Sequence, residues 1–200
     1  MAHSRALRWR VSAAGGLVLA VALTASVSAT ARTAARVRQD TLRLHVQAGS
    51  DSPADQRLKL QVRDAVLTEA AAVFADCTDA RAACRAARAA IPRFQRAAER
   101  TAARAGSRTP VRVQLTSMSF PTTQYRQFSL PPGPYRALRV ELGRAHGHNW
   151  FCVLYPSLCL PAAQGGAPAA WPAPDEQRLV MAHCQVKFAV LEWWQRLRER

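Results

Sequence analysis

Alternating apolar and polar residues mark three segments of the chain as β-strands. Residues 41–48 alternate with aliphatic side chains on one face, which predicts a half-buried strand. The same period recurs over 111–119 and 135–142. Residues 143–161 lack this period, and we expect them to be irregular, with several aromatic side chains.

Between the first two strands the apolar positions follow the 3.6-residue period of a helix. One helix is expected over 53–74, with Ser52 as its N-cap and Asp55 in its first turn. An Ala- and Arg-rich helical stretch follows over 79–105, and Pro92 is expected to kink it or to begin a new segment. Strands and helices without regular βαβ alternation predict an α+β fold: a small mixed sheet packed with helices in a single, disulfide-stabilised domain.

Two segments near the C-terminus are less regular. Residues 161–175 are rich in Pro, Ala and Gly and are expected to form a flexible loop. Residues 185–197 are apolar and predict either a strand that runs into a helix or a helix throughout.

The N-terminus has the layout of a secretory signal peptide. Arg5, Arg8 and Arg10 precede an uncharged run over 11–31 that ends in small residues. Residues 1–31 are therefore expected to be a signal peptide or, if they are not cleaved, an N-terminal anchor. A polar linker over 32–40 would join this segment to a domain at 41–197.

The 200-residue chain is strongly basic, because 28 Lys and Arg against 13 Asp and Glu give a net charge of +15. A hydrophobic fraction of 49% excludes a wholly disordered chain. The basic residues form no compact stripe interleaved with aromatic residues, so nucleic acid is not an expected partner. An anionic membrane surface suits an exported basic domain better.

Export favours disulfides among the five cysteines. Cys152 and Cys159 flank a turn that contains proline, and closing this short loop is worth roughly 2.5 kcal/mol. Cys77 and Cys84 can pair only if the helix breaks between them, because seven helical residues separate Cα atoms by about 10.5 Å. The odd count leaves at least one thiol, such as Cys184, free or intermolecular.

Two kinds of reactive site are conceivable, and neither is favoured. A zinc site would draw its ligands from His146, His148, Cys152 and either His45 or His183. A nucleophilic thiol would pair His45 or His148 with Cys152, Cys159 or Cys184. Zinc motifs usually offer paired ligands at both ends of a spacer, and an exported thiol must escape oxidation. We therefore expect no metal, no cofactor and no catalytic residue.

Several blocks of the sequence, in order over 41–195, resemble the stage II sporulation protein R family. The first block has LRLHV from Leu42, then Ser50-Asp51-Ser52, Asp55-Gln56 and Val62-Arg63-Asp64. Later blocks are Phe120-Pro121-Thr122 with Tyr125, Leu130-Pro131, Ala137-Leu138-Arg139-Val140, Asn149-Trp150, Cys152-Val153-Leu154, Leu158-Cys159 and Glu192-Trp193-Trp194. The Ala/Arg-rich stretch and residues 161–175 are not covered.

The resemblance implies an intercellular signal of endospore formation that is not an enzyme. Such a protein is exported from the forespore into the intermembrane space, where it activates a membrane-embedded aspartic protease. That protease removes the pro-sequence of the mother-cell sigma factor. The alternative is an exported thiol- or metal-dependent enzyme acting at the cell envelope, with His45 or the Asp51/Asp55 pair in its site.

For a signalling ligand, the candidate partner-binding residues are polar or aromatic side chains beside turns, which are typical of recognition surfaces. They are His45, Ser50, Asp51, Asp55, Gln56, Asn149 and Trp150.

Overall fold

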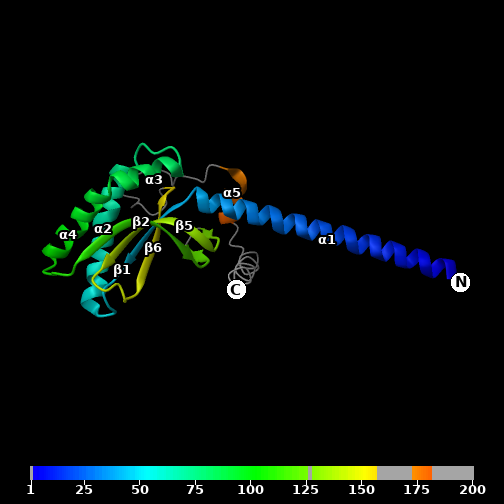
Figure 1. The fold of residues 1–200 in the computed structure, drawn as a ribbon, viewed down its shortest axis with the longest axis horizontal. Coiled ribbons are helices and arrows are strands. Elements are labelled where there is room, and N and C mark those ends of the chain that lie inside the picture. The colour runs from blue at the N-terminus through cyan, green and yellow to red at the C-terminus, as the bar shows by residue number, and fades with distance from the viewer. Residues whose placement is uncertain (1, 126–127, 157–172, 182–200) are drawn as a thin grey trace.

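A computed structural model describes residues 2–125, 128–156 and 173–181 (Figure 1). A long N-terminal helix projects from a domain in which a small sheet is packed with helices. The helices are α1 (Ala2–Gln39), α2 (Pro53–Val73), α3 (Ala80–Ala89), α4 (Ile91–Arg104) and α5 (Pro174–Met181). The strands are β1 (Leu42–Gln47), β2 (Val111–Phe120), β3 (Thr123–Gln124), β4 (Ser129–Leu130), β5 (Gly133–Leu142) and β6 (Asn149–Tyr155).

Four strands form a mixed sheet in the order β2-β5-β1-β6. β1 runs parallel to β5 and antiparallel to β6, and β2 pairs antiparallel with β5. The α+β architecture with a small mixed sheet is confirmed. β6 corrects the expectation of an irregular segment over 143–161, because residues 149–155 form a strand.

Helices α2, α3 and α4 cover one face of the sheet and enclose the first core. The Ser52 hydroxyl caps α2 by accepting from the Asp55 amide, and Pro53 begins the helix, as predicted. Pro92 lies in the first turn of α4, so the Ala/Arg-rich stretch is two helices. Both bury alanine against the domain, and Phe94 is the large anchor of α4.

The opposite face of the sheet carries a second, smaller core. It joins the last turns of α1, helix α5 and the β3–β4 hairpin to the sheet. Residues 32–39, predicted as a polar linker, are the end of α1, and Ala34 and Val37 are fully buried there. The prediction failed because this short segment has only three apolar residues among its arginines, too few to show a helical period.

β1 is buried on both faces, which corrects the prediction of a half-buried strand. Leu42, Leu44 and Val46 enter the first core, whereas Arg43 and His45 face the second core with at most 2% of their surface exposed. A central strand between two layers has no solvent side, and here its polar residues are buried as well.

The uncharged part of α1 contributes the one helix, within the described residues, that is long and apolar enough to cross a membrane. The candidate span is Ala14–Gln39, near the N-terminus. A signal sequence would pass the same test, so the finding is compatible with either a signal peptide or an anchor.

Several predictions fall partly or wholly outside the described residues. Residues 161–172 of the expected loop, Cys159, Cys184 and the apolar segment 185–197 all belong to this group. Residues 174–175 begin α5 instead of continuing the loop. Cys152 is fully buried, and its pairing with Cys159 stays a prediction. Cys77 and Cys84 are free thiols.

Val37→Asp tests whether the end of α1 belongs to the domain. We expect the substitution to lower the free energy of unfolding by at least about 2 kcal/mol, because it buries a carboxylate without a partner. Chemical unfolding of the full chain in neutral detergent measures the loss. Gln39→Asp, exposed on the same helix end, should cost less than about 1 kcal/mol. Equal effects would contradict the packing.

Candidate functional site

Two loops lie side by side at one end of the sheet. The β1–α2 loop accepts backbone hydrogen bonds from the β5–β6 loop, Gly147 N to Ala48 O at 3.0 Å and His146 N to Gly49 O at 3.3 Å. A Cβ on Gly147 would lie 2.2 Å from the Ser50 carbonyl oxygen, a distance that side-chain carbon atoms do not tolerate. Glycine at 147 therefore sets how closely the two loops approach.

Asp51 links the two loops through its carboxylate. Its Oδ1 accepts from the His148 amide at 2.6 Å and lies 2.5 Å from the His148 ring nitrogen Nδ1. Gln56 reinforces this link by donating to Asp51 Oδ1 at 3.3 Å and to the Ser50 carbonyl at 2.9 Å. The hydrogen bond from the His148 backbone, followed by contributions of its ring, lowers the pKa of Asp51. The carboxylate is thus ionised and remains half exposed.

Asp55 has a different environment from Asp51. The Ser50 hydroxyl donates to Asp55 Oδ2 at 2.5 Å, and the Ser50 Oγ also accepts from the Ser52 amide. Asp55 lies in the first turn of α2, where a carboxylate is stabilised by the helix dipole. The two carboxylates are therefore held by separate partners, and the described contacts give no acid–base pair.

Lys59 connects the two loops through its ammonium group, and the sequence pattern did not indicate this role. The residue is 6% exposed, and its ammonium donates to Gln56 Oε1 at 2.6 Å and to the His148 carbonyl at 3.1 Å. Burial lowers the pKa of Lys59. One sequence feature could have indicated this role: Lys59 lies one helical turn after Gln56, and residues three apart share a face of a helix.

These residues form one unit, which we call the loop cluster. It consists of Ser50, Asp51, Asp55, Gln56, Lys59 and His148. Four of the seven predicted site residues belong to it. Asn149 adjoins it as the exposed first residue of β6, opposite Gln47 in β1.

The other two predicted residues lie on opposite faces of the sheet. Trp150 packs against the first core, with the Arg63 guanidinium 4.9 Å from its ring centroid. His45 faces the second core, where its ring stacks on Phe151 with centroids 5.2 Å apart. They are therefore not parts of one surface with the loop cluster. Trp150 combines packing with partial exposure, whereas His45 is buried.

A buried cation next to His45 is the second polar feature that the sequence did not reveal. Arg43 is fully buried, with its guanidinium carbon 3.9 Å from the Phe120 centroid and 5.0 Å from that of Tyr135. Its Nη2 donates to the Thr123 hydroxyl and the Tyr125 phenol oxygen at 3.1 and 3.0 Å. These contacts tie the β3–β4 hairpin to the central strand.

The two reactive sites considered from the sequence are not assembled among the described residues. No group of three or more His, Cys, Asp and Glu side chains gathers there as a metal site would require. Cys152 and His45 face opposite cores, so they form no dyad. Burial raises the pKa of the Cys77 and Cys84 thiols, which disfavours the nucleophilic thiolate. His183 lies outside the described residues.

Comparison with known proteins gives a coherent result. Residues 38–164 match the family model described as stage II sporulation protein R. A curated relative of that name from Bacillus subtilis (strain 168) is 37% identical over 123 residues, which are 62% of this chain. The match spans 55% of the relative's own length. No solved structure matches the chain.

Gly147→Ala should separate the two loops. The added methyl group meets the Ser50 backbone, so the loops must move apart and the hydrogen bonds to Asp51 weaken. We expect amide hydrogen exchange at residues 146–148 to become at least about tenfold faster, which corresponds to 1.4 kcal/mol. Gly106→Ala, where a Cβ meets no atom, should leave that exchange unchanged despite its own positive φ of 72°. Unaltered exchange in Gly147→Ala would refute the close approach.

His45 should make stability depend on pH. Burial lowers its pKa from the usual 6.5, and the nearby charges are Arg43 in β1 and Arg139 and Glu141 in β5. The unfolded chain therefore binds a proton more readily than the folded one, and stability falls as pH drops below about 6.5. This contribution is at most about 1.4 kcal/mol per pH unit.

Chemical unfolding between pH 7.5 and 5.5 measures this dependence. His45→Phe keeps an aromatic ring at the stack and should flatten the decline. His146→Gln, in the exposed loop, should follow the wild-type profile. A decline in His45→Phe as steep as in the wild type would assign it to other groups.

Proposed function

Because the chain belongs to the stage II sporulation protein R family, we propose that it is an exported signalling protein of sporulation that activates a membrane-embedded aspartic protease. The activated protease then removes the pro-sequence of the mother-cell sigma factor. The protein acts as a ligand in the intermembrane space and performs no catalysis. Its N-terminal apolar helix suits export, either as a cleaved signal peptide or as an anchor.

The observation that carries the proposal is the loop cluster, which lies within the family match. It displays an ionised Asp51 beside the exposed Asn149, on loops held by backbone contacts and by Lys59. A preorganised surface loses little conformational entropy on binding, so its polar groups contribute more to affinity. This surface is therefore our choice for the contact with the protease.

Activation then follows from differential binding. A ligand shifts an equilibrium only by binding one state more tightly than the other. The loop cluster would bind the extracytoplasmic face of the protease in its active arrangement. An anionic membrane would hold the basic domain near that face and raise its effective concentration.

We also propose that a Cys152–Cys159 disulfide stabilises the domain. Cys152 lies in β6 opposite Leu44 of the central strand and is fully buried. A cross-link from this position would fix the chain that leaves the sheet after β6. The oxidising side of the membrane suits such a bond.

Reconstitution tests the proposed role. The full chain, the cognate membrane-embedded protease and its pro-sigma substrate are co-expressed in a heterologous cell, and processing is followed by immunoblot. We expect processing only when this protein is present and exported. A folded, exported protein without processing would contradict the proposal, as would processing in its absence.

Substitutions then test the surface. Asp51→Ala and Asn149→Ala should lower processing about tenfold or more, as expected for interface anchors worth at least 1.4 kcal/mol. Asp76→Ala, an exposed turn residue away from the cluster, should leave processing intact. Trp150→Ala is less decisive, because it also removes packing on Arg63. Circular dichroism confirms the fold of each variant, and normal processing by both cluster variants would move the contact elsewhere.

A further inference from the structure

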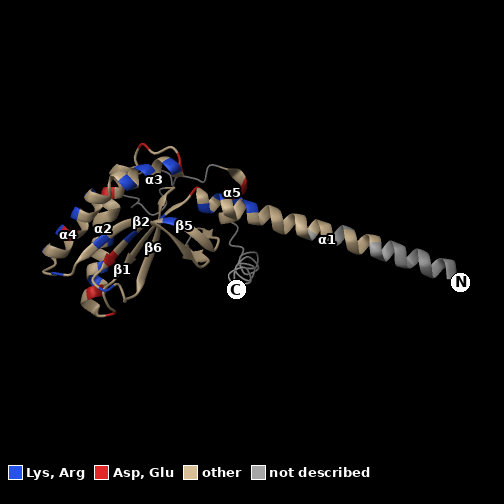
Figure 2. Cartoon of the chain, viewed as in Figure 1, with Lys and Arg blue, Asp and Glu red and all other residues tan. Residues whose placement is uncertain are grey.

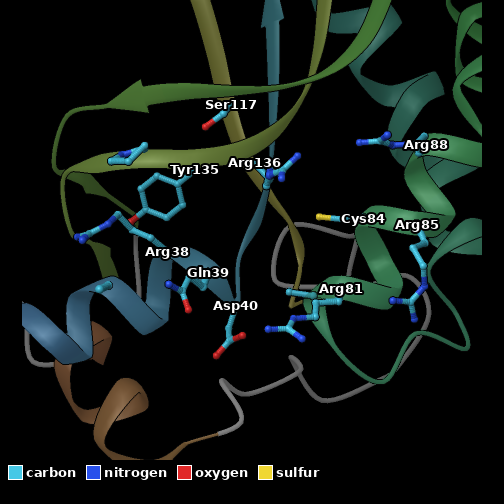
Figure 3. A pocket seen from close by; sticks show the side chains of 13 residues that line it. Arg38, Gln39, Asp40, Arg81, Cys84, Arg85, Arg88, Ser117, Tyr135 and Arg136 are labelled. Carbon is cyan, nitrogen blue, oxygen red and sulfur yellow. The ribbon is translucent and has the colours of Figure 1, made fainter.

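A cavity of about 750 Å³ opens where α1 ends, between α3 and the start of β5 (Figure 3). Five arginines from three elements line it, namely Arg38, Arg81, Arg85, Arg88 and Arg136. Asp40 is the sole acidic residue among the described lining residues. The formal charge of the cavity wall is therefore +5 − 1 = +4.

The arginines of α3 are spaced so that one helix face presents them together. Arg81, Arg85 and Arg88 follow the i, i+4, i+7 pattern. In Figure 3, Arg88 and the Cys84 thiol point toward Arg136, and Arg81 points toward Asp40. Arg88 and Arg136 both act electrostatically on Cys84, which places their charges around the same part of the cavity.

These cations have few neutralising partners. Within the described residues no carboxylate forms an ion pair with any of the five arginines of the cavity, although five other arginines do form such pairs: Arg36, Arg63, Arg93, Arg100 and Arg139. Arg38 donates to the Pro132 carbonyl instead. Like charges held around one cavity repel each other, and a bound anion would relieve that repulsion. Guanidinium groups match phosphate oxygens with two parallel hydrogen bonds.

The cavity lies close to where a membrane surface would be. Residues 11–31 carry no charge, and 21 helical residues span about 31 Å, the thickness of a bilayer core. In Figure 2 the tan part of α1 shows no charged residue before the basic residues at its end. The helix continues without a break to Gln39, so Arg38 lies about 10 Å beyond Ala31, near the outer edge of the headgroup layer.

We propose that this cavity binds the phosphate of an anionic phospholipid headgroup. The lining begins at Ala35, beyond the uncharged run over 11–31, so a domain released by cleavage within that run keeps the site. The choice of a lipid over a free anion rests on the proposed membrane-proximal role. The attraction between the basic domain and an anionic membrane is thus located at the arginine cavity.

Binding is measured with the full chain purified in dodecyl maltoside, by thermal unfolding during titration with dihexanoyl phosphatidylglycerol. We expect a rise in Tm of about 3–6 °C at ten times Kd. Dihexanoyl phosphatidylcholine and inorganic phosphate at equal concentration should shift Tm by less than about 1 °C. An equal shift with phosphate would overturn the lipid assignment, and an equal shift with the zwitterionic lipid would overturn the anion site.

The triple variant Arg81→Gln, Arg85→Gln, Arg88→Gln should lose the shift. The matched control is Arg96→Gln, Arg104→Gln, Arg108→Gln, which removes the same charge from exposed positions in and after α4 and should keep it. Should the triple variant misfold, Arg88→Gln alone should weaken binding at least about threefold, because Arg88 points toward Arg136 across the cavity. A shift kept by the folded cavity variants refutes the site. No protease is present, so this result is independent of the processing assay.

Discussion

Burial of β1 on both of its faces is the constraint on which the rest of the domain depends. The strand pairs with β5 on one side and β6 on the other, and it contributes side chains to both cores. Arg43 is the residue of β1 that is most costly to bury, because a guanidinium without exposed surface loses its hydration. Aromatic faces and two hydroxyl groups replace part of that water, whereas Nε and Nη1 are buried without a hydrogen-bond partner. The β3–β4 hairpin and the aromatic second core are thus required by one side chain of the central strand.

The two layers around the sheet have unequal chemistry. The first core is aliphatic and alanine-rich, and it is enclosed by three helices. The second core holds Phe120, Tyr135 and Phe128 together with the buried polar groups of β1. The loop cluster lies where the chain leaves β1 for the helical layer. Its carboxylates and Lys59 are therefore anchored to the side of the domain with the larger core, which favours a fixed arrangement of the exposed groups.

The elements in which apolar and polar residues alternate with a clear period were predicted from the sequence. Those that are apolar on both faces were not. Ser52 and Pro53 marked the start of α2 correctly, because capping is a local interaction. β6 was not predicted because both of its faces are apolar. Trp150 and Cys152 enter one core while Phe151 and Val153 approach the other, so the sequence shows no alternation of apolar and polar residues. The loop cluster was found in part, since turn residues in the β1–α2 segment signal it locally. Lys59 and His148 could not be placed, because their partners are brought together only by the pairing of β1 with β6.

The alanines that α3 and α4 bury have a consequence for how the domain tolerates change. Ala83, Ala87, Ala98 and Ala102 are at most 2% exposed, so these helices approach the interior with side chains one carbon long. Enlarging any of them would force the helices outward, and overpacking of this kind costs about 1–3 kcal/mol. Truncation has little left to remove beyond the roughly 1 kcal/mol helix penalty of glycine. The size of these side chains is thus limited from above, because the gap between helix and sheet leaves no room for a larger residue.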